Sequence, residues 1–238
     1  MDSKDIYVRI DYDSFTRRAP QAIKGFPTGT RVYKGFQGSG KTLSMVHYAL
    51  KILQDYPDCI CYSNIIIRHE RVNLFFTNDE LEQILNLEVG EKGLLLLLDE
   101  AHLFFNKKRG ISLDFLTAIS QQRKNRFHII MSSQIWEELD ISLRKQVKTI
   151  VNCHSLFRTV IINDISDGQT LTYDKMEGSY VAKKLYTYVF HMTKKETELY
   201  DTYQRISRND EYIERHKTDT YLPIEAQQRG KNLRRFGK

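Results

Sequence analysis

The chain has 238 residues, of which 41% are hydrophobic and 28% charged, so it can bury a sizeable core and is not disordered over most of its length. Its formal net charge of +6 favours polyanionic partners only mildly. We expect neither a transmembrane helix nor a signal peptide, because the longest apolar run covers only residues 94–98 and the N-terminus has no basic start. Cys59, Cys61 and Cys153 are expected to be buried thiols in a reducing, intracellular compartment.

The first hundred residues alternate between strand-like and helix-like patterns. Residues 1–29 contain Pro20 and Pro27, and we expect them to form a short strand near residues 6–8 and then to wrap around the domain. The elements expected next are a strand over 31–34, a helix over 43–56, a strand over 59–67, a helix from about 77 to 87 and a strand over 94–98. Five leucines are too few for a buried helix, so 94–98 predicts a central parallel strand that is covered on both faces.

The second half of the chain continues this alternation. We expect a helix over 112–124, strands over 127–131, 149–157, 159–165 and 185–191, a helix over 140–147 capped by Asp140, a polar loop or hairpin over 167–184 and a helix over 194–206. Alternating elements with buried apolar strands predict an α/β fold with a mainly parallel central sheet flanked by helices. The expected organisation is an N-terminal wrapping segment (1–29), a phosphate-loop ATPase domain (30–206) and a basic C-terminal tail (207–238).

Residues 35–42, Gly-Phe-Gln-Gly-Ser-Gly-Lys-Thr, fit the phosphate-binding pattern G-x-x-x-x-G-K-[ST] between a predicted strand and a predicted helix. In such a loop the backbone N–H groups and the helix N-terminus face the phosphates. Lys41 can reach the β- and γ-phosphates, and the Thr42 hydroxyl can ligate Mg²⁺. The residues expected to bind the nucleotide are Gly35, Gln37, Gly38, Ser39, Gly40, Lys41, Thr42 and Leu43. The motif predicts ATP and Mg²⁺ as ligands, although nothing in the sequence excludes GTP.

The apolar run 94–98 ends in two carboxylates, Asp99 and Glu100. Hydrolysing NTPases use such a pair: the first carboxylate lies beside Mg²⁺, and the second orients and deprotonates the attacking water. A small-molecule kinase avoids activating water, so the pair favours hydrolysis over phosphate transfer to a substrate. The alternative is a solvated acidic turn, which is less compatible with five preceding apolar residues and an upstream phosphate loop.

Gln134 ends the next predicted strand and is therefore a candidate to hydrogen-bond the lytic water or to sense the γ-phosphate. Three arginines are candidates for a finger that a neighbouring subunit supplies to the transition state. Arg123 and Arg126 end the predicted helix before that strand, and Arg144 lies on the short helix after it. For each arginine the alternative is a basic helix end that complements the helix dipole.

Together these motifs resemble the viral DNA-packaging ATPases of the FtsK–HerA superfamily, including the related Zot-like assembly proteins of filamentous phages. The resemblance covers about residues 30–205 and is carried by the segments 35–42, 97–102, 121–125, 129–134, 139–144 and 200–203. It implies a RecA-like core that assembles into a ring, with a hexamer favoured over a pentamer, and threads double-stranded DNA through its centre. It also matches Asp99 and Glu100 to the metal and water positions, and Gln134 to the strand-end sensor.

In such a ring, loops that face the axis would contact DNA. Lys107, Lys108 and Arg109 form the best candidate loop, with Lys183–Lys184 and the basic tail as weaker ones. Lysine and arginine can hold phosphates without reading bases, which suits movement along any sequence. The alternative for each is a solvated charged surface. The resemblance further implies a capsid portal or vertex protein as partner, in the host-cell cytoplasm or associated with the virion.

The leading hypothesis is an ATP-hydrolysing motor that translocates double-stranded DNA and packages a viral genome into a preformed capsid. The alternative is a Zot-like virion assembly or secretion ATPase that acts on a protein partner at a membrane. That alternative calls for a separate membrane subunit, because the membrane span that filamentous-phage relatives carry after this domain is not expected here. A third reading is a nucleotide switch without motor activity. Ring size, packaging direction and the identity of the finger stay open at this stage.

Overall fold

The computed structural model describes residues 8–10, 25–105, 113–156, 159–176, 178–193 and residue 199. Its strands are β1 (Val8–Ile10), β2 (Gly29–Lys34), β3 (Ile60–Ser63), β4 (Val72–Leu74), β5 (Leu94–Leu98), β6 (Phe127–Ser133), β7 (Val147–Leu156), β8 (Val160–Asp167), β9 (Thr172–Asp174), β10 (Ser179–Val181) and β11 (Lys184–His191). Its helices are α2 (Lys41–Asp55), α3 (Asn78–Leu85), α4 (Leu113–Ser120), α5 (Gln122–Asn125) and α6 (Ile141–Gln146), with short 3₁₀ turns η1 (Ala101–Leu103), η2 (Trp136–Glu138) and η3 (Gly168–Thr170).

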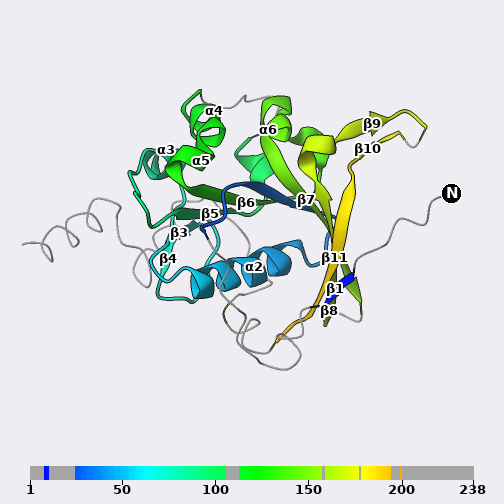
Figure 1. The fold of residues 1–238 in the computed structure, drawn as a ribbon, viewed down its shortest axis with the longest axis horizontal. Helices are drawn as coiled ribbons and strands as arrows, with labels where there is room; N and C mark the ends of the chain where they lie inside the picture. Colours follow the sequence, from blue (N-terminus) through cyan, green and yellow to red (C-terminus); the bar gives the residue numbers. More distant parts are fainter. Residues whose placement is uncertain are drawn as a thin grey trace, which may run out of the picture.

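One sheet organises the described residues (Figure 1). It has 9 strands in the order β1-β11-β8-β7-β2-β6-β5-β3-β4, while β9 and β10 form a separate antiparallel hairpin. Every strand pair from β7 to β4 is parallel, and within this sheet only β8 runs against its neighbours. The predicted α/β class with a mainly parallel central sheet is therefore confirmed.

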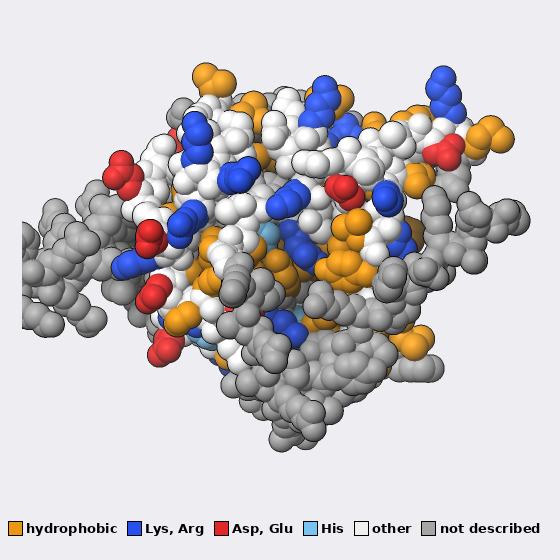
Figure 2. Space-filling view, in the orientation of Figure 1, with side chains coloured by type: hydrophobic (Ala, Val, Ile, Leu, Met, Phe, Trp, Pro, Cys, Tyr) orange, Lys and Arg blue, Asp and Glu red, His pale blue; other side chains and the backbone are white. Residues whose placement is uncertain are grey.

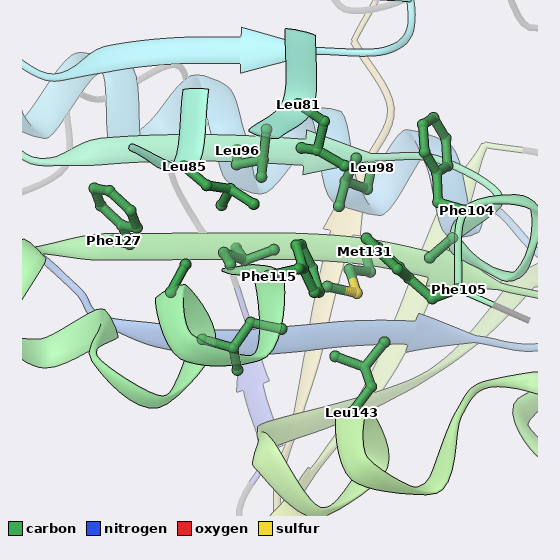
Figure 3. Close-up of a cluster of buried hydrophobic side chains, with 14 of the residues drawn as sticks. Leu81, Leu85, Leu96, Leu98, Phe104, Phe105, Phe115, Phe127, Met131 and Leu143 are labelled. Carbon is green, nitrogen blue, oxygen red and sulfur yellow. The ribbon is translucent and has the colours of Figure 1, made fainter. Parts of the chain in front are cut away.

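Helices cover both faces of this sheet, with α2 on one side and α3 to α6 on the other (Figure 1). Alternation along β5 explains the two layers, because Leu94, Leu96 and Leu98 pack in the cluster that includes α3, α4 and α6, whereas Leu95 and Leu97 pack against α2. Figure 3 shows the first cluster between the sheet and the helices. Complete burial of a leucine contributes roughly 1.5–3 kcal/mol, so this strand anchors the sheet from both sides.

Most predicted elements are present, with shifted ends. The expected strand over 59–67 stops at Ser63, where the Ser63 hydroxyl accepts from the Ile65 amide at 3.1 Å and donates to the Ile65 carbonyl at 2.9 Å. This local turn competes with further pairing to β5. The chain returns as β4, an edge strand that was not predicted because three residues cannot show a two-residue periodicity.

The expected helix over 112–124 is two helices, since Gln121 leaves the helical region between α4 and α5. Beyond the break the Gln122 side chain is buried, and its Nε2 donates to Thr30 Oγ1 at 2.6 Å. The predicted Asp140 cap is confirmed, because its side chain accepts from the Ser142 amide at 2.7 Å. The polar segment 167–184 contains η3 and the β9–β10 hairpin, as the loop-or-hairpin prediction allowed.

Several predictions fall on residues outside the described part of the chain: positions 6–7 of the first strand, most of the wrapping segment, the helix over 194–206 and the tail 207–238. The described strand β1 overlaps the first of these predictions only at Val8. All three cysteines are free and buried, as predicted, and burial raises the pKa of Cys59 to about 11 and of Cys153 to about 12. None of the helices in the described residues is long and apolar enough to cross a membrane.

Candidate functional site

The predicted site residues meet at one edge of the sheet because β2, β6 and β5 are parallel neighbours. Gly35 follows the end of β2, Asp99 follows β5 and Gln134 follows β6. Carboxyl ends of adjacent parallel strands are where open α/β sheets bind ligands. The parallel arrangement thus brings residues from three separate strands together in one compact site.

The phosphate loop occupies the turn between β2 and α2. Gly38 and Gly40 have φ values of 78° and 87°, a region in which glycine is free and other residues are strained. A Cβ on Gly40 would also lie 2.8 Å from Ile161 Cδ1, so the Ile161 side chain would have to shift to admit one. The loop conformation therefore depends on the glycines of the motif.

Polar groups of this loop fit phosphate oxygens. Lys41 is buried, and its Nζ donates to the Phe36 carbonyl at 3.0 Å across the loop. The Ser39 hydroxyl is buried without a hydrogen-bond partner among the described residues. An ammonium held over the loop, an unpartnered hydroxyl and the N-terminus of α2 together form an anion-binding arrangement. Gln37 is exposed, and Leu43 packs its side chain against Ile161 and Phe190, which leaves only its backbone to face a nucleotide.

Asp99 lies beside Thr42 at the centre of the site. Thr42 Oγ1 lies 3.1 and 3.2 Å from the two carboxylate oxygens, and Ser132 Oγ donates to Oδ1. Burial raises the pKa of Asp99, while hydrogen bonds from Ser132 and Thr42 and the charge of Lys41 act in the opposite direction. A hydroxyl and a carboxylate side by side are oxygen ligands of the kind that Mg²⁺ takes together with phosphate oxygens. The donor set fits the predicted metal.

Asn64 fixes the backbone of Asp99. Its side-chain Oδ1 accepts from the Asp99 amide at 2.7 Å, and its Nδ2 donates to the Asp99 carbonyl at 2.9 Å. Both groups are buried, so this pair of hydrogen bonds holds the end of β5 in place. Sequence reasoning missed Asn64 because the strand over 59–67 was expected to continue through it. Its position as a polar residue at the end of a strand that neighbours β5 could have identified it.

Glu100 adopts a left-handed backbone with φ 52°, which for a residue other than glycine costs roughly 1–3 kcal/mol and must be held by its surroundings. Its amide donates to Ser132 Oγ at 2.9 Å. Gln134 Nε2 donates to Glu100 Oε1 at 2.6 Å, and His102 Nδ1 lies 3.3 Å from Oε2. The structure thus brings Glu100 and Gln134 together, and the roles predicted for them stay predictions; His102 and Ser132 are additional residues to which the sequence analysis gave no role.

None of the three candidate arginines lies at this site in its own chain. Arg123 and Arg126 are exposed near the start of β6, at the opposite end of the strand from Gln134, and Arg126 Nη1 donates to the Glu91 carbonyl at 2.9 Å. Arg144 is buried at 7% exposure, with its guanidinium 5.2 Å from the centre of the Tyr180 ring. A finger role for any of them stays a prediction and requires a second subunit. Lys107, Lys108 and Arg109 lie outside the described residues.

Two solved structures and one protein family are similar to this chain. A solved N-terminal domain of zonular occludens toxin from Neisseria meningitidis is similar over 73% of this chain and 98% of that domain, with a TM-score of 0.52 at 18% identity. The genome packaging NTPase B204 of Sulfolobus turreted icosahedral virus 2 aligns over 66% of this chain and 97% of its own, with a TM-score of 0.46 at 15% identity. No curated protein matches. The model of the zonular occludens toxin (Zot) family matches residues 30–205, and the chain therefore belongs to this family and has the P-loop NTPase fold expected from its resemblance.

Proposed function

We propose that the protein is an ATPase motor that translocates double-stranded DNA and packages a viral genome into a preformed capsid. The observation that carries its hydrolytic part is the position of Glu100, one residue beyond the Asp99–Thr42 pair and hydrogen-bonded to Gln134 at 2.6 Å. This arrangement combines a phosphate-binding loop, a metal position and the Glu100 carboxylate. Among the described residues, Glu100 forms no salt bridge with lysine or arginine.

In this proposal Lys41, Ser39 and the amides of the loop bind the phosphates, and Thr42 with Asp99 holds the metal ion. Mg²⁺ bound there would neutralise charge on the phosphates and polarise the γ-phosphoryl group. Glu100 orients a water molecule and takes its proton. Gln134 holds one oxygen of the Glu100 carboxylate through its hydrogen bond, and the other oxygen lies 3.3 Å from His102 Nδ1 without a hydrogen-bond partner among the described residues.

Exposed apolar side chains around the site support a ring of identical subunits. Phe36 and Ile135 each adjoin a predicted site residue, Leu103 lies three residues after Glu100, and the three are 91%, 45% and 42% exposed. Burial of these side chains against a second subunit would be favourable, because it removes apolar area from water. A second copy packed here would cover these residues and bring an arginine to the site, for which Arg123 and Arg126 are both exposed. A hexamer is favoured and a pentamer is the alternative.

The DNA part of the proposal rests on charge and on the sequence resemblance. The chain has a net charge of +6, and Figure 2 shows lysine and arginine side chains spread over the middle of one face, with most acidic ones towards one side. Lys107, Lys108 and Arg109 are the proposed axial contacts. A capsid portal or vertex protein is the proposed partner, and the proposed location is the host-cell cytoplasm or the virion.

The test is ATP turnover with and without long duplex DNA, on full-length protein whose mass is measured by light scattering. Turnover by a ring that rises with DNA supports the motor. A combined Lys107→Ala, Lys108→Ala and Arg109→Ala variant should lose the stimulation and keep basal turnover, whereas Lys92→Ala, an exposed lysine elsewhere, should keep both. A monomer with negligible turnover would contradict the motor and favour a nucleotide switch.

Membership of the Zot family favours one second candidate, an assembly or secretion ATPase that acts on a protein partner at a membrane. The same assay separates the two candidates. Turnover that ignores DNA but rises with a virion coat protein supports this second candidate.

A further inference from the structure

A second concave site lies on the face of the sheet opposite α2, between the sheet and the β9–β10 hairpin. It is a pocket of 170 Å³. Its floor comes from β2, β7 and β8, where Lys34 pairs in register with Asn152 and Ile150 pairs with Ser166. Its roof is Tyr180 with its apolar neighbours in the hairpin. Four segments that are far apart in sequence thus enclose it.

The polar side chains that line this pocket include one cation, three groups that can donate hydrogen bonds, and no acid. Lys34, Asn152, Ser166 and Tyr180 line it, and no aspartate or glutamate does. Two buried N–H groups beside it have no hydrogen-bond partner among the described residues: Trp136 Nε1 and Arg144 Nε. The Trp136 ring lies 5.8 Å from Lys34 Nζ, and the Arg144 guanidinium lies 5.2 Å from the centre of the Tyr180 ring. Buried N–H groups of this kind normally have partners, and both lie next to residues that line the pocket without lining it themselves.

Lys34 is the cation of this pocket. Its ammonium has no ion-pair partner in the described part of the chain, although Glu137 on η2 acts on it electrostatically at longer range. Burial lowers its pKa, which means that the charged form has lost part of its hydration without a full replacement. An anion in the pocket would supply that replacement through a charge-assisted hydrogen bond.

We propose that this pocket binds a carboxylate, held by Lys34 with the Asn152 amide and the Ser166 and Tyr180 hydroxyls as additional donors. The apolar side chains of Ile150 and Leu171 can contact the carbon atoms next to the carboxylate. The carboxylate has two possible sources, a free small acid or an acidic side chain of a second copy of this chain. Lys34 directly precedes Gly35 of the phosphate loop. Its register partner on β6 is Ser133, which directly precedes Gln134. A carboxylate bound to Lys34 would therefore contact a residue next to the nucleotide site.

Trp136, the single tryptophan of the chain, can report on this pocket because its ring lies 5.8 Å from Lys34 Nζ. Full-length protein saturated with MgADP is titrated with malonate at constant ionic strength, and tryptophan fluorescence is followed. We expect a saturable change for wild type and for Lys34→Arg, and an affinity lower by about 10-fold or more for Lys34→Met. Lys92→Met, which removes an exposed lysine elsewhere, should bind as wild type does. Ser166→Ala should weaken binding more mildly and serves as a second variant if Lys34→Met does not fold.

Light scattering over a range of protein concentrations distinguishes the two sources. Saturable malonate binding that depends on Lys34 supports a free acid. Absence of malonate binding, with self-association of Lys34→Met shifted to at least about 10-fold higher concentration, supports a carboxylate from a second copy. The proposal is overturned if Lys34→Met changes neither property, if sodium chloride alone reproduces the fluorescence change, or if Lys41→Ala removes the response, which would assign it to the phosphate loop.

Discussion

The sheet has two parts on either side of β2 that differ in direction and in exposure. On one side, β6, β5, β3 and β4 all run parallel to β2, and every residue of β5 and β6 is buried. On the other side, the reversed strand β8 lies between β7 and β11, and the strands alternate between buried and half-exposed residues. Asp99, Glu100 and Gln134 directly follow these strands, which are buried on both faces.

The half that contains β8 instead carries the donor-rich pocket under the β9–β10 hairpin. Its polar residues lie within strands, not after them, so they face the surface of the sheet and not its edge. The residues that we propose for hydrolysis therefore lie at the ends of the parallel strands, whereas the proposed carboxylate pocket lies mainly on the other half of the sheet. Each prediction below compares a change in one part of the molecule with a matched change elsewhere.

Apart from the replacement of the proposed base Glu100, the largest effect is expected at the metal position. Asp99→Asn keeps the side-chain shape but removes the charge beside Thr42, and should lower Mg²⁺-dependent ATP turnover by about 10²- to 10³-fold. Asp58→Asn, an exposed carboxylate at the turn after α2, should leave turnover unchanged. Phosphate release measured over a range of Mg²⁺ concentrations tests this, and equal turnover by both variants would rule out the metal role of Asp99.

The next effect concerns nucleotide binding. Lys41→Ala removes the cation of the phosphate loop and should weaken ATP binding by about 10- to 100-fold, since one charge-assisted hydrogen bond is lost. Lys92→Ala is the matched control on an exposed lysine. Equilibrium binding of a fluorescent ATP analogue measures the difference. Unchanged affinity in Lys41→Ala would show that the nucleotide binds elsewhere.

A smaller effect is expected for the asparagine that clamps Asp99. Asn64→Ala leaves the buried amide and carbonyl of Asp99 without partners and should lower the free energy of unfolding by about 2–4 kcal/mol. Asn73→Ala on the edge strand β4 loses a single hydrogen bond to the Cys61 carbonyl of β3, and should lower the free energy of unfolding by about 1 kcal/mol. Urea denaturation compares the two. Similar losses for both variants would mean that Asn64 does not have the anchoring role assigned to it.

These residues also indicate what could be predicted from sequence. The phosphate loop, the Asp99–Glu100 pair and Gln134 were found because each has a local pattern: glycine spacing, or a polar residue directly after an apolar strand. Asn64 follows β3 directly, but the strand was expected to continue to residue 67, and Ser132 lies inside β6; the roles of both depend on which strands become neighbours. The donor-rich pocket is drawn from segments more than a hundred residues apart, and no single window of the sequence contains its signal.

The smallest effect concerns stability and pH. Burial lowers the pKa of His128 from 6.5 to about 3, with the charge of Arg31 adding to this and the bond to the Gly29 carbonyl opposing it. Between these two values the unfolded chain binds a proton that the folded protein does not, so stability falls as pH falls through this window. The expected slope is up to about 1.4 kcal/mol per pH unit.

His128→Gln removes one proton from the number taken up on unfolding, and should therefore reduce the slope of stability against pH. His154→Gln, at an exposed position on β7, should reduce that slope less. Free energies of unfolding measured at several pH values between 4 and 7, roughly the window in which the proton is taken up, give both slopes. Parallel slopes for His128→Gln and wild type would contradict the neutral buried state of this histidine.

The central claim is that the edge formed by β2, β5 and β6 hydrolyses ATP with Glu100 as the base. The most direct test is a single-turnover experiment in which wild type and Glu100→Gln each bind substoichiometric radiolabelled MgATP. Both proteins should bind the same fraction of the nucleotide. Wild type should convert it to ADP and phosphate, whereas Glu100→Gln should retain intact ATP, with a rate lower by about 10²- to 10⁴-fold. Equal rates of conversion in the two proteins would contradict the account.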